Sequence, residues 1–151
     1  MNAMQHILPL KGWSGFLKEA VKFIQNDKTG KIEIAKHNLQ YRLILDTPDW
    51  PFSALLVFKD KTIKVFAVSE SIMNDLENWD AKLTLPAPVA LELFIGNFKP
   101  TIRSLFHGEV KIKKLLKLRK VLWFIKFSIQ FYKNNRGLAR SMFWKMYNAD
   151  H

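Results

Sequence analysis

The chain has 151 residues, of which 48% are hydrophobic, and it carries a net charge of +11 and no cysteine. This length suits one domain able to bury a core, and the lack of cysteine excludes disulfides and thiolate metal sites. No uncharged apolar run reaches the roughly 20 residues of a spanning helix, and Pro9, Lys11 and Gly12 interrupt the start too early for a signal peptide. We therefore expect one domain over residues 1–151, located in the cytoplasm.

The first segments predict a helix followed by strands. Apolar residues recur with helical spacing from Gly12 to Asn26. Residues 31–46 then show two short alternating patterns, the first at Ile32 and Ile34 and the second over residues 39–45, with a polar turn between them. We expect a strand at each pattern.

A hairpin and a further strand are predicted next. The apolar run Ala54–Lys59 and the alternating segment Thr62–Val68 favour two antiparallel strands joined by a tight turn. The segment Ser69–Trp79 fits a loop or one helical turn. Polar and apolar residues alternate again in Ala81–Leu85, which predicts a half-buried strand.

Two short helices and a fifth strand follow. Pro88 opens the helix Val89–Ile95, which is apolar on nearly every side. Such a helix is either buried on both sides in the core or in contact with another apolar molecule. The sequence alone does not decide between these two alternatives. Pro100 opens a second helix, in which Ile102, Leu105 and Phe106 are expected to face inward, and a strand is predicted over residues 109–113.

The last third of the chain carries the charge. Residues 99–151 hold 13 Lys and Arg against two acidic residues, whereas residues 1–98 hold 11 basic and 11 acidic residues. Leu115–Leu122 predicts a helix, Trp123–Tyr132 fits both a helix and a strand, and an amphipathic helix is expected after Gly137. A cationic, aromatic-rich surface suits an anionic partner, either phospholipid or nucleic acid. The simpler alternative is a solvated basic face.

The order of elements after Ala81–Leu85 is distinctive. A short helix is followed by Gly96, Pro100, Leu105, Gly108, Val110 and Ile112. This order resembles the sterol carrier protein (SCP2-like) family of lipid-binding domains, in which a strand, a short helix and a Gly–Pro link precede a strand of the form Leu–x–x–Gly–x–apolar–Lys–apolar. One departure is that Lys113 and Lys114 stand where family members usually have a glycine, which concerns the turn after the strand.

The resemblance implies an α+β fold with about five mainly antiparallel strands, helices covering one face, and a hydrophobic tunnel between the layers. It also implies non-catalytic binding or transfer of an apolar lipid, such as a sterol, a fatty acyl chain or an isoprenoid quinone precursor. Some bacterial members of similar plan are accessory factors of ubiquinone assembly, so enzymes of lipid or quinone metabolism are expected partners. By this resemblance the tunnel wall includes Leu83, Leu91, Phe94, Ile95, Phe98, Ile102, Leu105 and Phe106.

The basic end of the chain then predicts peripheral docking on an anionic membrane, at the inner face, where the carrier loads or unloads. Anionic headgroups attract lysine and arginine, and tryptophan and phenylalanine settle at the headgroup boundary. The expected docking residues are Lys113, Lys114, Lys117, Arg119, Lys120, Trp123, Phe143 and Trp144.

No sequence motif indicates catalysis. The chain has no HExxH or GxSxG motif and no glycine-rich phosphate loop, so we expect no enzyme activity, no metal and no cofactor. The alternative function is a single-stranded nucleic-acid-binding or scaffold protein, because Lys120, Lys126 and the aromatic residues between them could follow a backbone and stack bases. The aromatic signature of an RNA-recognition motif is missing, and nucleic acid is not the expected partner.

Overall fold

A five-stranded sheet forms one layer of the molecule in this computed structural model, which describes residues 9–37, 40–69, 79–114 and 118–151. The strand order is β3-β2-β1-β4-β5. Neighbouring strands are antiparallel except β1 and β4, which run parallel with Leu45 opposite Leu83. The strands are β1 Tyr41–Asp46, β2 Ala54–Lys59, β3 Thr62–Ala67, β4 Ala81–Thr84 and β5 Lys111–Lys113.

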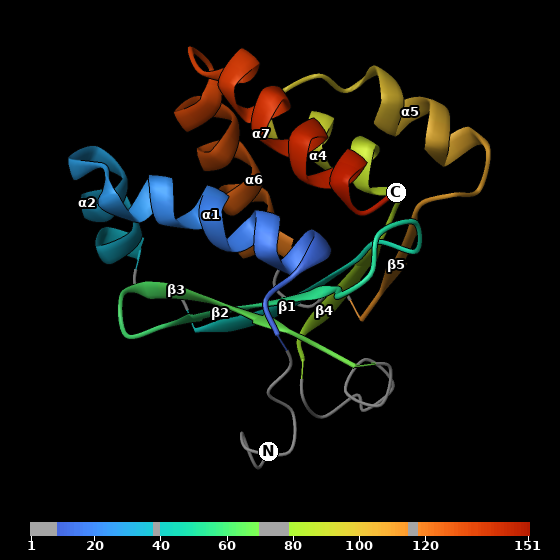
Figure 1. Cartoon of the computed structure of the whole chain (residues 1–151). Coiled ribbons are helices and arrows are strands. Elements are labelled where there is room, and N and C mark those ends of the chain that lie inside the picture. Colours follow the sequence, from blue (N-terminus) through green and yellow to red (C-terminus); the bar gives the residue numbers. More distant parts are fainter. Residues whose placement is uncertain (1–8, 38–39, 70–78, 115–117) are drawn as a thin grey trace.

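Helices cover one face of this sheet (Figure 1). The predicted α+β fold, with a mainly antiparallel sheet and helices on one side, is confirmed. Among the described helices, none is long and apolar enough to cross a bilayer. The helices are α1 Gly12–Asn26, α2 Lys28–His37, α4 Ala87–Phe94, α5 Lys99–Phe106, α6 Leu118–Tyr132 and α7 Arg136–Ala149.

The main core lies between the helices and the sheet. Helix α1 buries one stripe of residues with 3–4 spacing, including Trp13 and Phe16. The ring of Phe143, from α7, lies 5.3 Å from both Phe16 and Trp50 in edge-on contacts, so the C-terminal helix is anchored in the core. A smaller cluster, Ile44, Leu55, Val68 and Trp79, is buried on the opposite face of the sheet.

One predicted strand is wrong. The segment with Ile32 and Ile34 is part of helix α2, in which Ile34 is buried and Ile32 is exposed. Two alternating residues are too short a pattern to identify a strand. Asp27 also caps this helix, because its carboxylate accepts a hydrogen bond from the backbone N–H of Gly30 at 2.9 Å. The second predicted strand is present as β1.

The ambiguous segment Trp123–Tyr132 is helical throughout. In α6 the buried residues Val121, Phe124, Ser128 and Tyr132 recur every three or four positions, which places them on one face. The packing of this face against the core outweighs the strand preference of the β-branched and aromatic residues. The other predicted helices and strands are present, and the predicted helix Leu115–Leu122 is confirmed from Leu118 onward, because residues 115–117 lie outside the described part. The prediction for Ser69–Trp79 likewise falls mostly on residues 70–78, outside the described part.

The two glycines of the sequence motif stand at backbone turns after helices. Gly96 and Gly108 follow α4 and α5 with φ of +95° and +71°, a region that glycine enters without strain. Lys114, near the position where the family has a glycine, also has a positive φ, +51°. Its ammonium donates a hydrogen bond of 2.8 Å to the carbonyl of Trp79 and lies 5.1 Å from the indole ring centroid. Lys114 therefore occupies a backbone region that a glycine would enter without strain, and its side chain is anchored to Trp79.

Candidate functional site

An open apolar cleft lies between the β4–β5 end of the sheet and helices α5 and α6. Its volume is about 180 Å³. Leu105, Ile112 and Leu122 line it and are each about half exposed, which shows that the cleft opens to the outside. All of its lining residues are apolar except Thr101: Leu43, Leu83, Leu85, Leu93, Thr101, Leu105, Val110, Ile112, Val121, Leu122 and Ile125.

Thr101 is the single polar residue on this wall. Its hydroxyl oxygen Oγ1 is buried and has no hydrogen-bond partner among the described residues. A hydroxyl in such a position loses its hydration without compensation. The surface of the open cleft is therefore hydrocarbon throughout, and the unsatisfied hydroxyl of Thr101 is buried behind it.

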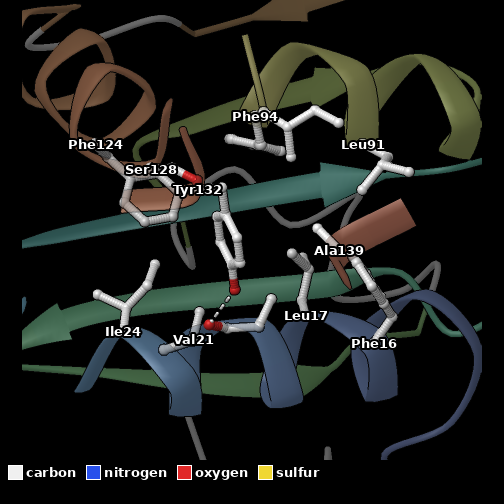
Figure 2. Close-up of a pocket in the computed structure, with 12 residues that line it drawn as sticks. Phe16, Leu17, Val21, Ile24, Leu91, Phe94, Phe124, Ser128, Tyr132 and Ala139 are labelled. Carbon is white, nitrogen blue, oxygen red and sulfur yellow. Dashed lines mark hydrogen bonds between the residues drawn. The ribbon is translucent and has the colours of Figure 1, made fainter. Parts of the chain in front are cut away.

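A second, closed chamber lies in the core between α1, α4, α6 and α7 (Figure 2). Every residue that lines it is buried, and its volume is about 30 Å³, enough for about two water molecules but not for a lipid. The Tyr132 hydroxyl donates a hydrogen bond of 2.8 Å to the carbonyl of Ala20 across this chamber. Burial raises the pKa of Tyr132 well above its ordinary value, so this phenol stays neutral.

Helices α4 and α6 form the wall between the two spaces. On α4, Leu93 lines the open cleft and its neighbour Phe94 lines the closed chamber. On α6, Ile125 lines the cleft and Phe124 the chamber. The rings of Phe94 and Phe124 meet edge-on with centroids 5.7 Å apart. The apolar helix α4 thus contributes hydrocarbon to both spaces, through Leu93 to the open cleft and through Phe94 to the closed chamber.

Two solved structures have the same architecture. One is described as "UbiJ-SCP2 Ubiquinone synthesis protein" and is 15% identical, with a TM-score of 0.54 over 78% of this chain and 88% of that chain. The other is the sterol carrier protein domain 2 of Helicoverpa armigera, 18% identical with a TM-score of 0.53 over 77% of this chain and 87% of that chain. The fold is SCP2-like. At these identities the likeness establishes the fold alone, and no model of a known protein family and no curated protein matches the sequence.

Within the SCP2-like fold, the eight expected tunnel residues separate into three groups. Leu83 and Leu105 line the open cleft. A second group lines the closed chamber. A third group is exposed on the outer side of α5 and at the residue before it, away from both spaces. The second group is Leu91, Phe94 and Ile95, and the third is Phe98, Ile102 and Phe106.

The inward orientation expected for α5 is wrong for Ile102 and Phe106, which are exposed. The side of α5 that is buried instead carries Ser104. Sequence reasoning also missed the contribution of α6 to the cleft, through Val121, Leu122 and Ile125. The 3–4 spacing of these three residues was the available signal, but it was obscured by the competing strand-like alternation nearby.

The expected docking residues are spread over several environments. Lys113, Lys114 and Arg119 are exposed, and the ammonium of Lys120 donates to the carbonyl of Gln40 at 3.2 Å. Lys117 lies outside the described residues.

The aromatic members of that set differ in exposure. Trp123 is half-buried and stacks on Phe127 at 5.4 Å, with His37 on it at 4.3 Å. Trp144 is exposed, whereas Phe143 is fully buried. Phe143 therefore has no free surface to offer a membrane while the core is intact.

The elements that surround the cleft are basic. Helix α5, strand β5 and helix α6 contain no Asp or Glu. Arg119 and Lys126, on α6, are three and four residues away from Leu122, so they share its side of the helix. The mouth of the open cleft is thus bordered by positive charge on α6.

Proposed function

We propose that this chain binds an apolar lipid without chemical conversion, as a single lipid-binding domain, and that the open cleft receives the lipid. The supporting observation is a cleft of about 180 Å³ whose wall is hydrocarbon except for Thr101 and which opens to the outside. Transfer of each methylene group from water to such a wall contributes roughly 0.8 kcal/mol. About five methylene groups then contribute about 4 kcal/mol, which corresponds to a Kd of about 1 mM before the entropic cost of association is counted, so a long chain is needed for tight binding.

The size of the cleft restricts how a ligand is held. Sites that enclose a whole small-molecule ligand have volumes of roughly 300–1,000 Å³, which is more than the open cleft provides. A sterol, a fatty acyl chain or an isoprenoid quinone precursor therefore enters with one segment, and the remaining length lies toward the mouth. Rotation of Thr101 about χ1 gives a ligand oxygen a hydrogen-bond partner at the wall.

We further propose that the basic second half of the chain docks on an anionic membrane. Exposed cations such as Lys113 and Arg119 are each attracted to anionic headgroups by roughly 1 kcal/mol. Helices α5 and α6 and strand β5 contain no carboxylate, and the exposed Glu109, between α5 and β5, is outnumbered by the cations around it. A carrier docked in this way would exchange its ligand with the bilayer or with enzymes of lipid or quinone metabolism. The fold shared with a protein described as a ubiquinone synthesis protein is consistent with that class of partner.

Nucleic-acid binding is less well supported. The aromatic residues interleaved with cations in α6 include Phe124 and Phe127, which are both buried in the core. Their rings are not available for stacking on bases. Between Lys120 and Phe127 only the ring of Trp123 is partly accessible, and it is already stacked on Phe127.

The proposal is tested by titrating the purified chain with a fluorescent fatty acid. The wild type should bind saturably, and Leu122→Gln should weaken binding about tenfold, because it replaces a cleft-lining apolar group. Leu138→Gln is the matched control, since Leu138 is a similarly exposed helical leucine on α7 that does not line the cleft. Equal affinities for the two variants, or binding of a single-stranded oligonucleotide in preference to the fatty acid, would contradict the proposal.

A further inference from the structure

Helix α5 presents its apolar side to the outside. Ile102, Leu105 and Phe106 are 52%, 53% and 88% exposed, and Phe98, which precedes the helix with helical backbone angles, is 48% exposed. These four residues follow the spacing i, i+4, i+7, i+8, so they form one stripe. On the other side, Ser104 is 4% exposed. The usual order of an amphipathic helix, apolar inside and polar outside, is reversed.

This reversal is costly for a helix that stays in water. Exposed apolar side chains forgo the roughly 1.5–3 kcal/mol that burial of each would contribute, and contiguous exposed apolar patches on proteins usually mark contact sites. The stripe is also continuous with the open cleft, because Leu105 belongs to both. Helix α5 lies at the outer edge of the helical layer, on the β5 side of the molecule (Figure 1), so the stripe is accessible.

The charges around the stripe indicate an anionic partner. Lys99 and Arg103 are exposed and lie next to the stripe on α5 itself. Across the cleft, Arg119 and Lys126 border Leu122 on α6. An apolar stripe flanked by lysine and arginine is the pattern of helices that lie in the interface of an anionic bilayer. A protein groove would satisfy the apolar residues, but it would need a matching set of carboxylates.

We propose that α5 is the membrane-insertion element of this protein: its stripe Phe98–Ile102–Leu105–Phe106 enters the headgroup–acyl boundary of an anionic bilayer and brings the mouth of the open cleft against the hydrocarbon. This inference deepens the proposed lipid binding and depends on it. The docking surface is centred on α5, with Arg119 and Lys126 at its border, and Trp144 and Phe143 do not belong to it. A lipid chain then moves between bilayer and cleft along Leu105 without crossing water.

The absence of cysteine makes a direct test available. Phe106→Cys gives the full-length chain one thiol, to which an environment-sensitive fluorophore is attached. With vesicles of phosphatidylcholine and phosphatidylglycerol, we expect a blue shift and quenching by lipids that carry a quencher on the acyl chain. The same label at Ile32→Cys, an exposed apolar position on α2, should show neither response.

Substitution of the stripe tests its contribution to affinity. Ile102→Gln combined with Phe106→Gln should reduce binding to the anionic vesicles at least about tenfold, whereas Phe23→Gln combined with Ile32→Gln, two exposed apolar positions on α1 and α2, should leave it unchanged within about twofold. Circular dichroism of both variants serves as the check that they keep the fold. Binding of the fluorescent fatty acid by detergent-free protein should survive in both.

The outcomes separate the two proposals. If the wild type does not bind the fatty acid, the proposed function fails, whatever the vesicles show. If the fatty acid binds but the label at position 106 does not respond to vesicles, the insertion proposal is wrong. It is also overturned if the Gln variants instead abolish a dimer seen by sedimentation, or if neutral vesicles bind as tightly as anionic ones.

Discussion

Substitution of Thr101 by valine should make the ligand-free protein more stable. The Thr101 hydroxyl oxygen is buried with no partner among the described residues, and a buried unsatisfied polar group costs roughly 1–3 kcal/mol. Valine has nearly the same shape and a similar helix propensity, so the substitution removes that cost and adds little of its own. We expect the free energy of unfolding to rise by about 1 kcal/mol.

The measurement is urea and thermal unfolding of the two proteins without ligand. For a chain of this size, about 1 kcal/mol corresponds to a rise in Tm of roughly 2–4 °C. Thr47→Val is the matched control, because Thr47 is also buried but its hydroxyl donates a hydrogen bond of 2.9 Å to the carbonyl of Trp50. This control should lower the stability by roughly 1–3 kcal/mol.

A second arm concerns the ligand. If the Thr101 hydroxyl binds a ligand oxygen, Thr101→Val should weaken binding of a long-chain alcohol about fivefold relative to an alkane of equal length, since a net hydrogen bond contributes about 1 kcal/mol. A Thr101→Val protein that unfolds as easily as Thr47→Val would refute the reasoning, because the hydroxyl would then have a stabilising partner.

Three further predictions concern stability. Lys114→Ala should be less stable than Lys114→Gly by about 1 kcal/mol in urea unfolding. Both variants lose the contact with Trp79, but only glycine adopts the positive φ without steric strain. Equal stabilities of the two variants would show that this backbone is unstrained. Glu92→Gln should cost about 0.5–1 kcal/mol and less in high salt, because Glu92 accepts hydrogen bonds of 3.0 and 2.9 Å from the partly exposed Arg140 guanidinium; a double-mutant cycle with Arg140→Gln measures the coupling. Burial raises the pKa of Tyr41 to about 12, so the folded state holds this proton more tightly than the unfolded state. The free energy of unfolding should therefore fall as pH rises from 10 through about 12. In Tyr41→Phe this decline should be shallower, and an unchanged slope would contradict the raised pKa of Tyr41.

Most of the fold was predictable because its signals are local. The hairpin of β2 and β3 has a buried strand, an alternating strand and a two-residue turn, and each signal favours the same structure. Helix α2 was missed because two isoleucines imitate strand alternation, whereas the decisive feature is the cap that Asp27 provides. The length of α6 could not be fixed from the sequence, since packing against the core, which no local pattern reports, overrides strand propensity there.

The site was harder to predict than the fold. The family resemblance placed Leu83 and Leu105 on a ligand wall, and both line the open cleft. The orientation of α5 could not be anticipated, because the amphipathic pattern alone directs Ile102 and Phe106 toward a core. Which side of such a helix is buried depends on neighbours that are distant in sequence. Thr101 carries no signal of its own, since a threonine in a helix is ordinary until its surroundings are known.

The position of α5 has a consequence for dynamics. This helix packs mainly against α4 and contributes the single residue Ser104 to the fully buried set, whereas α6 buries a whole face. Segments held by so few apolar contacts open locally at a free energy well below that of global unfolding. Backbone amides of α5 should accordingly exchange with deuterium earlier than those of α6. If the cleft binds lipid as proposed, such local opening would widen it for a ligand larger than its resting volume.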